Sequence, residues 1–109
     1  MLVRSEPRFH VRKTGWVPLS LALALGGCGN GLYSIQVLSA STKLEEAREL
    51  GAEQHAAYEY YMAKEHLDKA RTEAAEADYG DAIDLSEEAE KYAEKALVRL
   101  RTARSGAVR

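Results

Sequence analysis

Residues 57–78 read AYEYYMAKEHLDKARTEAAEAD, and the spacing of the small and apolar side chains in this stretch decides the fold. These side chains recur every three or four residues, which is the repeat of one face of an α-helix that packs against another helix. The positions on this repeat are Tyr60, Ala63, Leu67, Ala70, Ala74 and Ala77. Charged residues fill many of the other positions, so we predict a helix over 57–78 with a narrow buried stripe made mainly of alanine.

The same repeat continues in residues 81–104, where we predict another long helix. Its small and apolar positions are Ala82, Ser86, Ala89, Ala93, Ala96, Leu100 and Ala103. Acidic residues gather near its start and basic residues near its end, an order that complements the helix dipole. Between the two helices, Gly80 can adopt the left-handed conformation that closes a helix, and Asp81 can cap the helix that follows.

A shorter version of the repeat comes before them, in residues 32–50. Its positions are Tyr33, Val37, Ala40, Leu44, Ala47 and Gly51. Glycine just after a periodic run favours a helix end, so we predict a break within 51–56, with one continuous helix over 32–78 as the alternative. The predicted fold class is all-α: a small antiparallel bundle of two or three helices along an alanine-rich heptad seam. This domain covers residues 32–104, and a disordered tail is expected over 105–109.

The first 27 residues have the pattern of an export signal. Four basic residues come before an apolar run that extends from Trp16 to Leu25. A bilayer-spanning helix needs about 20 apolar residues, and this run has about half that number. We therefore expect a signal peptide over residues 1–27 and not a transmembrane helix.

The four residues Leu25-Gly26-Gly27-Cys28 end this run and include the one cysteine of the chain. They resemble the lipobox of bacterial lipoproteins, which is an aliphatic residue and two small residues before a cysteine. The resemblance implies that the leader is cut before Cys28 and that the Cys28 thiol carries a covalent lipid, with residues 28–31 as a tether. An unmodified thiol, either after an ordinary secretory signal or buried in a core helix, is the alternative.

The resemblance also bears on location. In the enteric sorting pattern, an aspartate after the lipidated cysteine keeps a lipoprotein in the inner membrane, and Gly29 stands there in this chain. We therefore expect the protein to lie at the periplasmic face of the outer membrane. The inner membrane and the cell surface are the alternative locations. Two or more acyl chains anchor a protein stably without help from the polypeptide.

Charge narrows the range of partners. The chain has 15 basic and 17 acidic residues, and residues 1–27 hold four of the basic and one of the acidic ones. The mature part then keeps 11 basic and 16 acidic residues, a net charge of −5. A nucleic-acid partner needs a basic face, so we expect none.

Catalytic and metal-binding patterns are weak throughout. His55 and His66 are too far apart in sequence for the usual zinc spacing, and we expect surface histidines. Asp78, Asp81 and Asp84 lack the ligand spacing of an EF-hand loop, so capping is the preferred interpretation. We expect no enzymatic activity, no small-molecule substrate, no metal, and no cofactor apart from the lipid on Cys28.

A second resemblance extends from Leu44 to Ala103. This segment resembles an uncharacterised alanine-rich helical domain found in short lipoproteins of Gram-negative bacteria. The resemblance rests on Gly51-Ala52, Tyr58-Glu59-Tyr60, Leu67-x-Lys69-Ala70-Arg71-x-Glu73-Ala74, Asp78-Tyr79-x-x-Ala82 and Ala89-x-x-Tyr92-Ala93-x-x-Ala96. The turn Asp78-Tyr79-Gly80-Asp81-Ala82 is also similar to a tetratricopeptide hairpin, and a single unit of that kind is present.

Tyrosine is the residue type that indicates a role in binding as well as in packing. Tyrosine is enriched at protein interfaces because it offers apolar area and a hydroxyl group at low entropic cost. Tyr58, Tyr61 and Tyr92 are the candidate docking surface, and ordinary burial within the bundle is the alternative. We predict a membrane-anchored, non-enzymatic interaction module that docks an envelope protein or associates with itself. A structural spacer or a peptidoglycan-associated coiled-coil lipoprotein is the second hypothesis.

Overall fold

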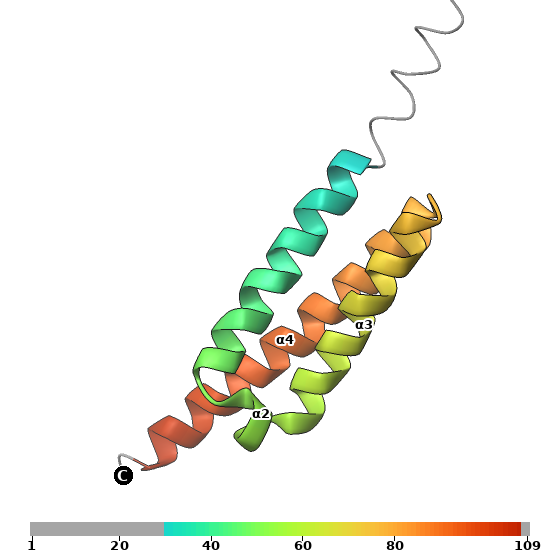
Figure 1. The fold of residues 1–109 in the computed structure, drawn as a ribbon. Helices are drawn as coiled ribbons and strands as arrows, with labels where there is room; N and C mark the ends of the chain where they lie inside the picture. The colour runs from blue at the N-terminus through green and yellow to red at the C-terminus, as the bar shows by residue number, and fades with distance from the viewer. Residues whose placement is uncertain (1–29, 108–109) are drawn as a thin grey trace, which may run out of the picture.

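The computed structural model describes residues 30–107, and nearly all of them are helical. The first helix covers residues 30–49 and is followed by α2 (Ala52–His55), α3 (Ala57–Ala75) and α4 (Tyr79–Ala107). Within this range there is no strand, and the helices pack against one another as a small all-α bundle (Figure 1). The predicted fold class is therefore confirmed.

The three long helices lie side by side in an up-down-up order (Figure 1). α3 and α4 form an antiparallel hairpin, and the first helix runs parallel to α4. The contacts between the first helix and α4 follow a parallel register. Tyr33 and Tyr79 have ring centroids 6.0 Å apart near one end, and Arg101 Nη2 lies 3.1 Å from Glu46 Oε1 towards the other. The start of the first helix consequently lies beside the turn between α3 and α4.

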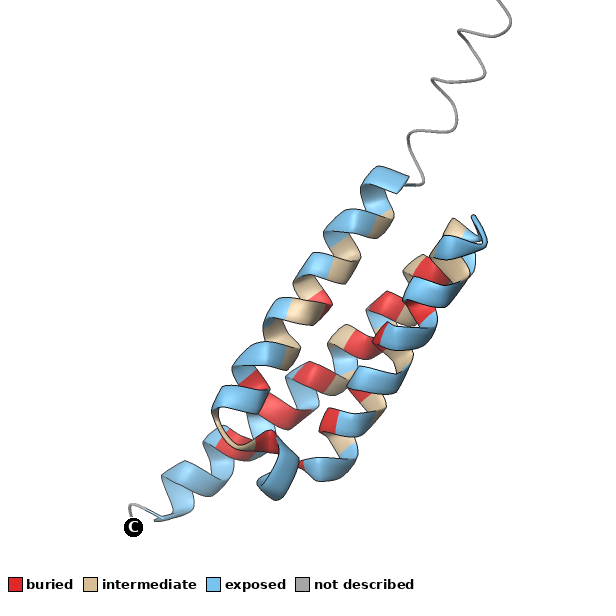
Figure 2. Cartoon of the chain, viewed as in Figure 1, coloured by how far each residue is buried: buried red, intermediate tan, exposed pale blue. Residues whose placement is uncertain are grey.

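The core is built mainly from methyl groups, and it follows the facing sides of the helices (Figure 2). The buried alanines are Ala40, Ala47, Ala52, Ala56, Ala63, Ala70, Ala82, Ala89, Ala93 and Ala96. Larger buried side chains are few: Tyr60, Leu97 and Leu100 pack in one cluster, and Leu67 packs in the other. Small side chains allow close approach of helix axes, near the lower end of the usual range of about 8–10 Å.

The predicted stripes are buried over most of their length. In α3 the stripe is buried from Tyr60 to Ala70, and Ala74 is half-buried. In α4 it is buried from Ala82 to Leu100, whereas Ala103 is exposed. Ala103 belongs to the last part of α4, which extends past the end of the bundle (Figure 1).

Gly51 ends the first helix, so the predicted break is confirmed and a continuous helix over 32–78 is wrong. Its φ of 88° lies in the left-handed region, which glycine adopts without steric cost. The single turn of α2 follows, and Ala56 then leaves helical geometry with φ −143° before α3 begins. These two bends reverse the chain direction and place Ala52 and Ala56 in the core next to Ala47.

The turn between α3 and α4 differs from the prediction. Gly80 lies inside α4, and the left-handed residue is Ala77, with φ 65°. The Ala77 N–H donates to Ala74 O at 3.0 Å and the Asp78 N–H donates to Glu73 O at 2.9 Å, which is the Schellman pattern. This pattern places the left-handed residue directly after Glu76, the C-cap residue of α3, and three residues before Gly80.

The capping residue of α4 also differs from the prediction. The Asp78 carboxylate accepts a hydrogen bond of 3.3 Å from the Asp81 N–H. Asp78 is thus the capping residue, and Asp81 is the residue whose backbone it caps, because α4 begins at Tyr79. At its other end α4 continues to Ala107, so residues 105–107 are helical and not a disordered tail.

None of the helices within the described range is long and apolar enough to cross a membrane. The expected signal peptide, Leu25, Gly26, Gly27 and the lipid-bearing Cys28 all lie outside the described residues.

Candidate functional site

Tyr58, Tyr61 and Tyr92, here called the tyrosine surface, lie on the α3–α4 hairpin. Tyr58 is 64% exposed and Tyr61 is 49% exposed, although both are large aromatic residues. The rings of Tyr58 and Tyr92 meet edge to face with their centroids 6.2 Å apart. Neighbouring Tyr60 is 5% exposed and belongs to the core. The helix therefore directs one tyrosine inward and leaves its neighbours at the surface.

Two side chains hold the Tyr92 ring in place. The His66 ring lies 5.4 Å from it, and His66 Nδ1 is itself 2.8 Å from the Met62 carbonyl oxygen. Lys95 Nζ lies 4.8 Å from the centre of the same ring, in cation–π geometry. Aromatic rings held in this way lose little entropy when a partner covers them.

A shallow hollow of about 300 Å³ adjoins the exposed tyrosines. It is lined by Ala57, Tyr58, Tyr61, Met62 and Glu65, all from α3. Its floor is mostly apolar, with the Glu65 carboxylate as a charged residue in the lining. Such a surface can receive an apolar side chain flanked by a hydrogen-bond donor or a cation.

Tyr92 and the first helix lie on opposite sides of α4. Tyr92 stands midway in sequence between Glu90 and Glu94, and both of those carboxylates pair with Lys43 of the first helix. At 3.6 residues per turn, two residues amount to about 200° around a helix. Tyr92 therefore points away from the side of α4 that receives the first helix.

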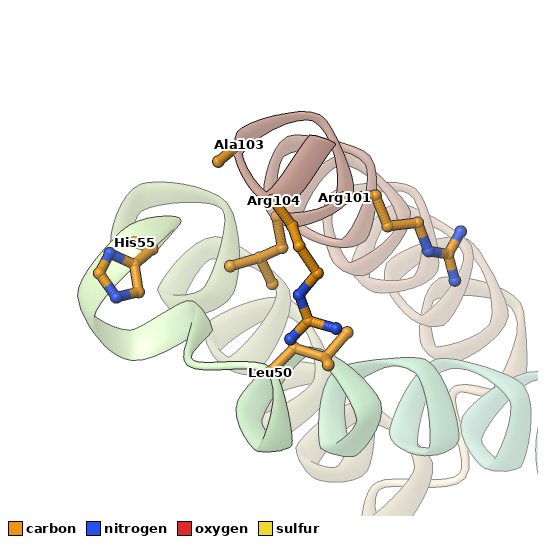
Figure 3. A pocket seen from close by; sticks show the side chains of 6 residues that line it. Leu50, His55, Arg101, Ala103 and Arg104 are labelled. Atoms are coloured by element: carbon orange, nitrogen blue, oxygen red, sulfur yellow. The ribbon is translucent and has the colours of Figure 1, made fainter. Parts of the chain in front are cut away.

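A separate pocket of about 330 Å³ lies where the first helix, α2 and α4 meet (Figure 3). Its lining is Leu50, His55, Leu100, Arg101, Ala103 and Arg104. In Figure 3 the Arg104 side chain extends towards Leu50, and His55 stands across the opening. Apolar walls with basic residues at the rim suit an apolar group that carries a negative charge. The sequence does not indicate this pocket, because α2, α4 and Leu50 just after the first helix form it together, and their register is not readable from the chain.

Three carboxylates gather at the α3–α4 turn. Oxygens of Glu73, Asp78 and Asp81 lie within 4.8 Å of one another, and Asp78 and Asp81 are exposed. Of the acids interpreted as capping residues, Asp78 acts as the helix cap described above, whereas Asp81 is the residue whose backbone it caps.

A polar link centred on Glu90 joins the first helix to α4. The Glu90 carboxylate accepts hydrogen bonds from the Lys43 ammonium and, at 2.7 Å, from the Ser39 hydroxyl. These bonds, that from Lys43 above all, lower the pKa of Glu90 against the opposing effect of burial. The hydrogen bonds to Glu90 and Glu94 raise the pKa of Lys43 in turn.

A second link joins α3 to α4. Arg99 Nη1 lies 2.9 Å from Glu59 Oε1, whereas the other oxygen of Glu59 is buried without a hydrogen-bond partner. A hydrogen bond from its own backbone N–H and the pairing with Arg99 lower the pKa of Glu59, and burial opposes them. Glu59 is an unusual half-buried acid, and its sequence neighbours give no sign of that position.

The structure thus brings Tyr58 and Tyr92 into contact and keeps Tyr61 exposed on the same helix, while Gly80 and Asp81 have roles other than those predicted. Neither a curated protein nor a solved structure matches this sequence. A family of domains does match, over residues 36–108, which is most of the chain and includes α2, α3 and α4. The chain therefore belongs to the family described as a domain of unknown function, DUF4398.

Proposed function

We propose that this protein is a lipoprotein, held by acyl groups on Cys28, whose helical bundle is a non-enzymatic interaction module of the cell envelope. The expected location is the periplasmic face of the outer membrane. The apolar run before Leu25-Gly26-Gly27-Cys28 supports the anchor. The first helix is described from Asn30 onwards, so the bundle would follow the lipid with almost no intervening chain.

The tyrosine surface is the observation that carries the docking role. Large exposed aromatic residues lose water-accessible apolar area when a partner covers them, and tyrosine is among the residues that dominate binding energy at interfaces. Tyr58 is 64% exposed, yet its ring rests against Tyr92. A bundle that needed Tyr58 only for stability would bury it, as it does Tyr60.

The docking role is tested by recovery of partners from detergent-solubilised envelopes. The bait is the full chain, expressed with its leader so that Cys28 can be processed. A stoichiometric protein partner, or a second copy of the chain, should be recovered with the wild type and lost with Tyr58→Ala plus Tyr61→Ala. Val98→Ala is the matched control, since Val98 is 60% exposed on α4 and lies outside the tyrosine surface.

Two outcomes would contradict the proposal. Recovery with peptidoglycan alone, unaffected by the tyrosine substitutions, would favour the spacer or peptidoglycan-associated lipoprotein. A purified native protein with an uncut leader or an unacylated Cys28, measured by mass spectrometry, would contradict the anchor.

A further inference from the structure

Leu32, Ile35 and Leu38, here called the outer face, form an exposed apolar strip on the first helix. Their exposed fractions are 53%, 66% and 67%. The segment around them is also uncharged, because no Asp, Glu, Lys or Arg occurs from Gly29 to Thr42. Nearly a third of the residues in the whole chain are charged, so this uncharged segment is distinctive.

The outer face lies opposite the side that packs into the bundle. Val37 and Leu44 are partly buried against the cluster of Ala40, Leu67 and Ala89. Ile35 is two residues from Val37, which is about 200° around the helix. Packing within the bundle therefore leaves Ile35, with Leu32 and Leu38, in contact with water.

We propose that the outer face lies in the headgroup region of the lipid bilayer, so that the bundle rests with its first helix on the membrane. This inference rests on the proposed lipid anchor at Cys28. Leu32 is four residues after Cys28, and four residues span at most about 14 Å. Acyl chains on Cys28 would keep the outer face within reach of the lipid surface at all times.

The charges further along the same helix limit this contact. Glu49 comes fourteen residues after Ile35, which is two heptads and hence nearly the same direction from the helix axis. It is exposed, and it lies about 21 Å further along the helix at 1.5 Å per residue. The exposed side of the first helix is therefore apolar at the outer face, near the anchor, and acidic further along. Lipid contact should end before Glu45, because a carboxylate disfavours both the apolar phase and an anionic surface.

This orientation also places the tyrosine surface. Tyr92 points away from the side of α4 that the first helix covers, so membrane contact through the first helix leaves Tyr58 and Tyr92 facing water. Lipid and partner can then occupy opposite sides of the bundle without competing. Interfacial helices usually add basic residues for attraction to anionic lipids, and this segment has none, so its contribution is orientation rather than affinity.

Tryptophan fluorescence tests the inference directly. Trp16 is the one tryptophan of the chain and is removed with the leader, so a substituted tryptophan is the sole one in the mature protein. The acylated full-length product carrying Ile35→Trp is placed in vesicles of phosphatidylethanolamine and phosphatidylglycerol with brominated acyl chains. Fluorescence should fall at least twofold relative to unbrominated vesicles. Glu49→Trp, on the same side of the helix, is the matched control, and its fluorescence should be the same in brominated and unbrominated vesicles.

Each further outcome decides between explanations. Adding Leu32→Ser and Leu38→Ser to Ile35→Trp should relieve the quenching. If the acylated Ile35→Trp protein floats with the vesicles and its fluorescence is unquenched, the inference is overturned and the lipid anchor stands. If Ile35→Cys instead links two copies by a disulfide, the outer face belongs to a second copy. A product without acyl groups that does not float would overturn both the inference and the proposed anchor.

Discussion

The Ser39 hydroxyl donates a hydrogen bond of 2.7 Å to the Glu90 carboxylate, from the first helix to α4. Lys43, one helical turn after Ser39, binds the same carboxylate. Tyr33 and Arg101 make further side-chain contacts between these two helices. The Glu90 carboxylate is the most enclosed of the acids that take part, with 20% of its side chain exposed. It is consequently the best place to test how charge holds the first helix to the hairpin.

Glu90 makes stability depend on pH. Its pKa is lowered in the folded protein, so its stabilisation is complete above the unfolded value of about 4.5 and is lost as the pH falls through the lower folded value. Glu90→Gln should reduce the free energy of unfolding at pH 7 by about 0.5–1 kcal/mol and flatten its decline below pH 4.5. Chemical denaturation from pH 3 to pH 7 measures this. Asp84→Asn, an exposed site on the same helix, should keep the wild-type decline.

Ala77 is a site where glycine should improve the fold. A left-handed conformation costs a non-glycine residue about 1–2 kcal/mol, and Ala77 adopts it with φ 65°. Glycine would remove this cost, and the larger entropy of glycine in the unfolded chain would offset part of the stabilisation. Ala77→Gly should therefore raise the free energy of unfolding by about 1 kcal/mol and the thermal midpoint by about 4–8 °C.

Gly51→Ala is the opposite substitution and serves as its counterpart. The new Cβ would meet His55 Cδ2 at 3.3 Å, and the φ of 88° would strain the alanine. We expect a loss of about 1 kcal/mol or more by thermal denaturation. A stabilised Gly51→Ala variant would show that the left-handed bend does not control the position of α2.

The interhelical space around Ala93 should not accept a larger side chain. Ala93 is fully buried on the face of α4 that meets the other helices. Ala93→Leu should lower the free energy of unfolding by about 1–3 kcal/mol, because added methylene groups force the helices apart. Ala103→Leu, on the same stripe but exposed, should change it by less than about 0.5 kcal/mol. Equal effects at the two sites would contradict close packing along the seam.

Arg99 should control the titration of Glu59. Removing its guanidinium takes away one of the causes that lower the pKa of Glu59 and leaves the opposing effect of burial in place. NMR titration of Arg99→Ala should therefore show a higher pKa for Glu59 than in the wild type. Arg104→Ala removes a basic residue of the same helix that does not pair with Glu59, and it should leave that pKa unchanged.

Periodicity was enough to predict the three long helices, because in a small bundle the spacing of alanine and leucine determines which side is buried. Ala63, Ala70, Ala89 and Ala93 illustrate this, since all lie in the core as their spacing indicated. Gly51 was equally informative, because the break depends on a left-handed conformation that glycine adopts without steric cost.

Local turn chemistry and long-range pairing were harder to predict. The rule that glycine occupies left-handed positions pointed to Gly80, but the length of α3 placed Ala77 there. Lys43 and Glu90 are 47 residues apart, and nothing in their sequence neighbourhoods shows that they meet. Among the site residues, the burial of Tyr60 followed from helical phase, whereas the sequence left the burial of Tyr58 open. The support of Tyr92 by His66 and Lys95 depends on the rotation of α3 against α4.

The core of methyl groups has a consequence for how this sequence can change. A buried alanine has almost no side chain left to remove, so substitutions can harm the interior mainly by adding volume. Ser86 already occupies one seam position, fully buried, with its hydroxyl bonded at 2.7 Å to the Ala82 carbonyl oxygen. The constraint on such a fold is an upper limit on side-chain size at regular intervals. Exchanges among alanine, glycine and serine can therefore accumulate along these helices while the architecture persists.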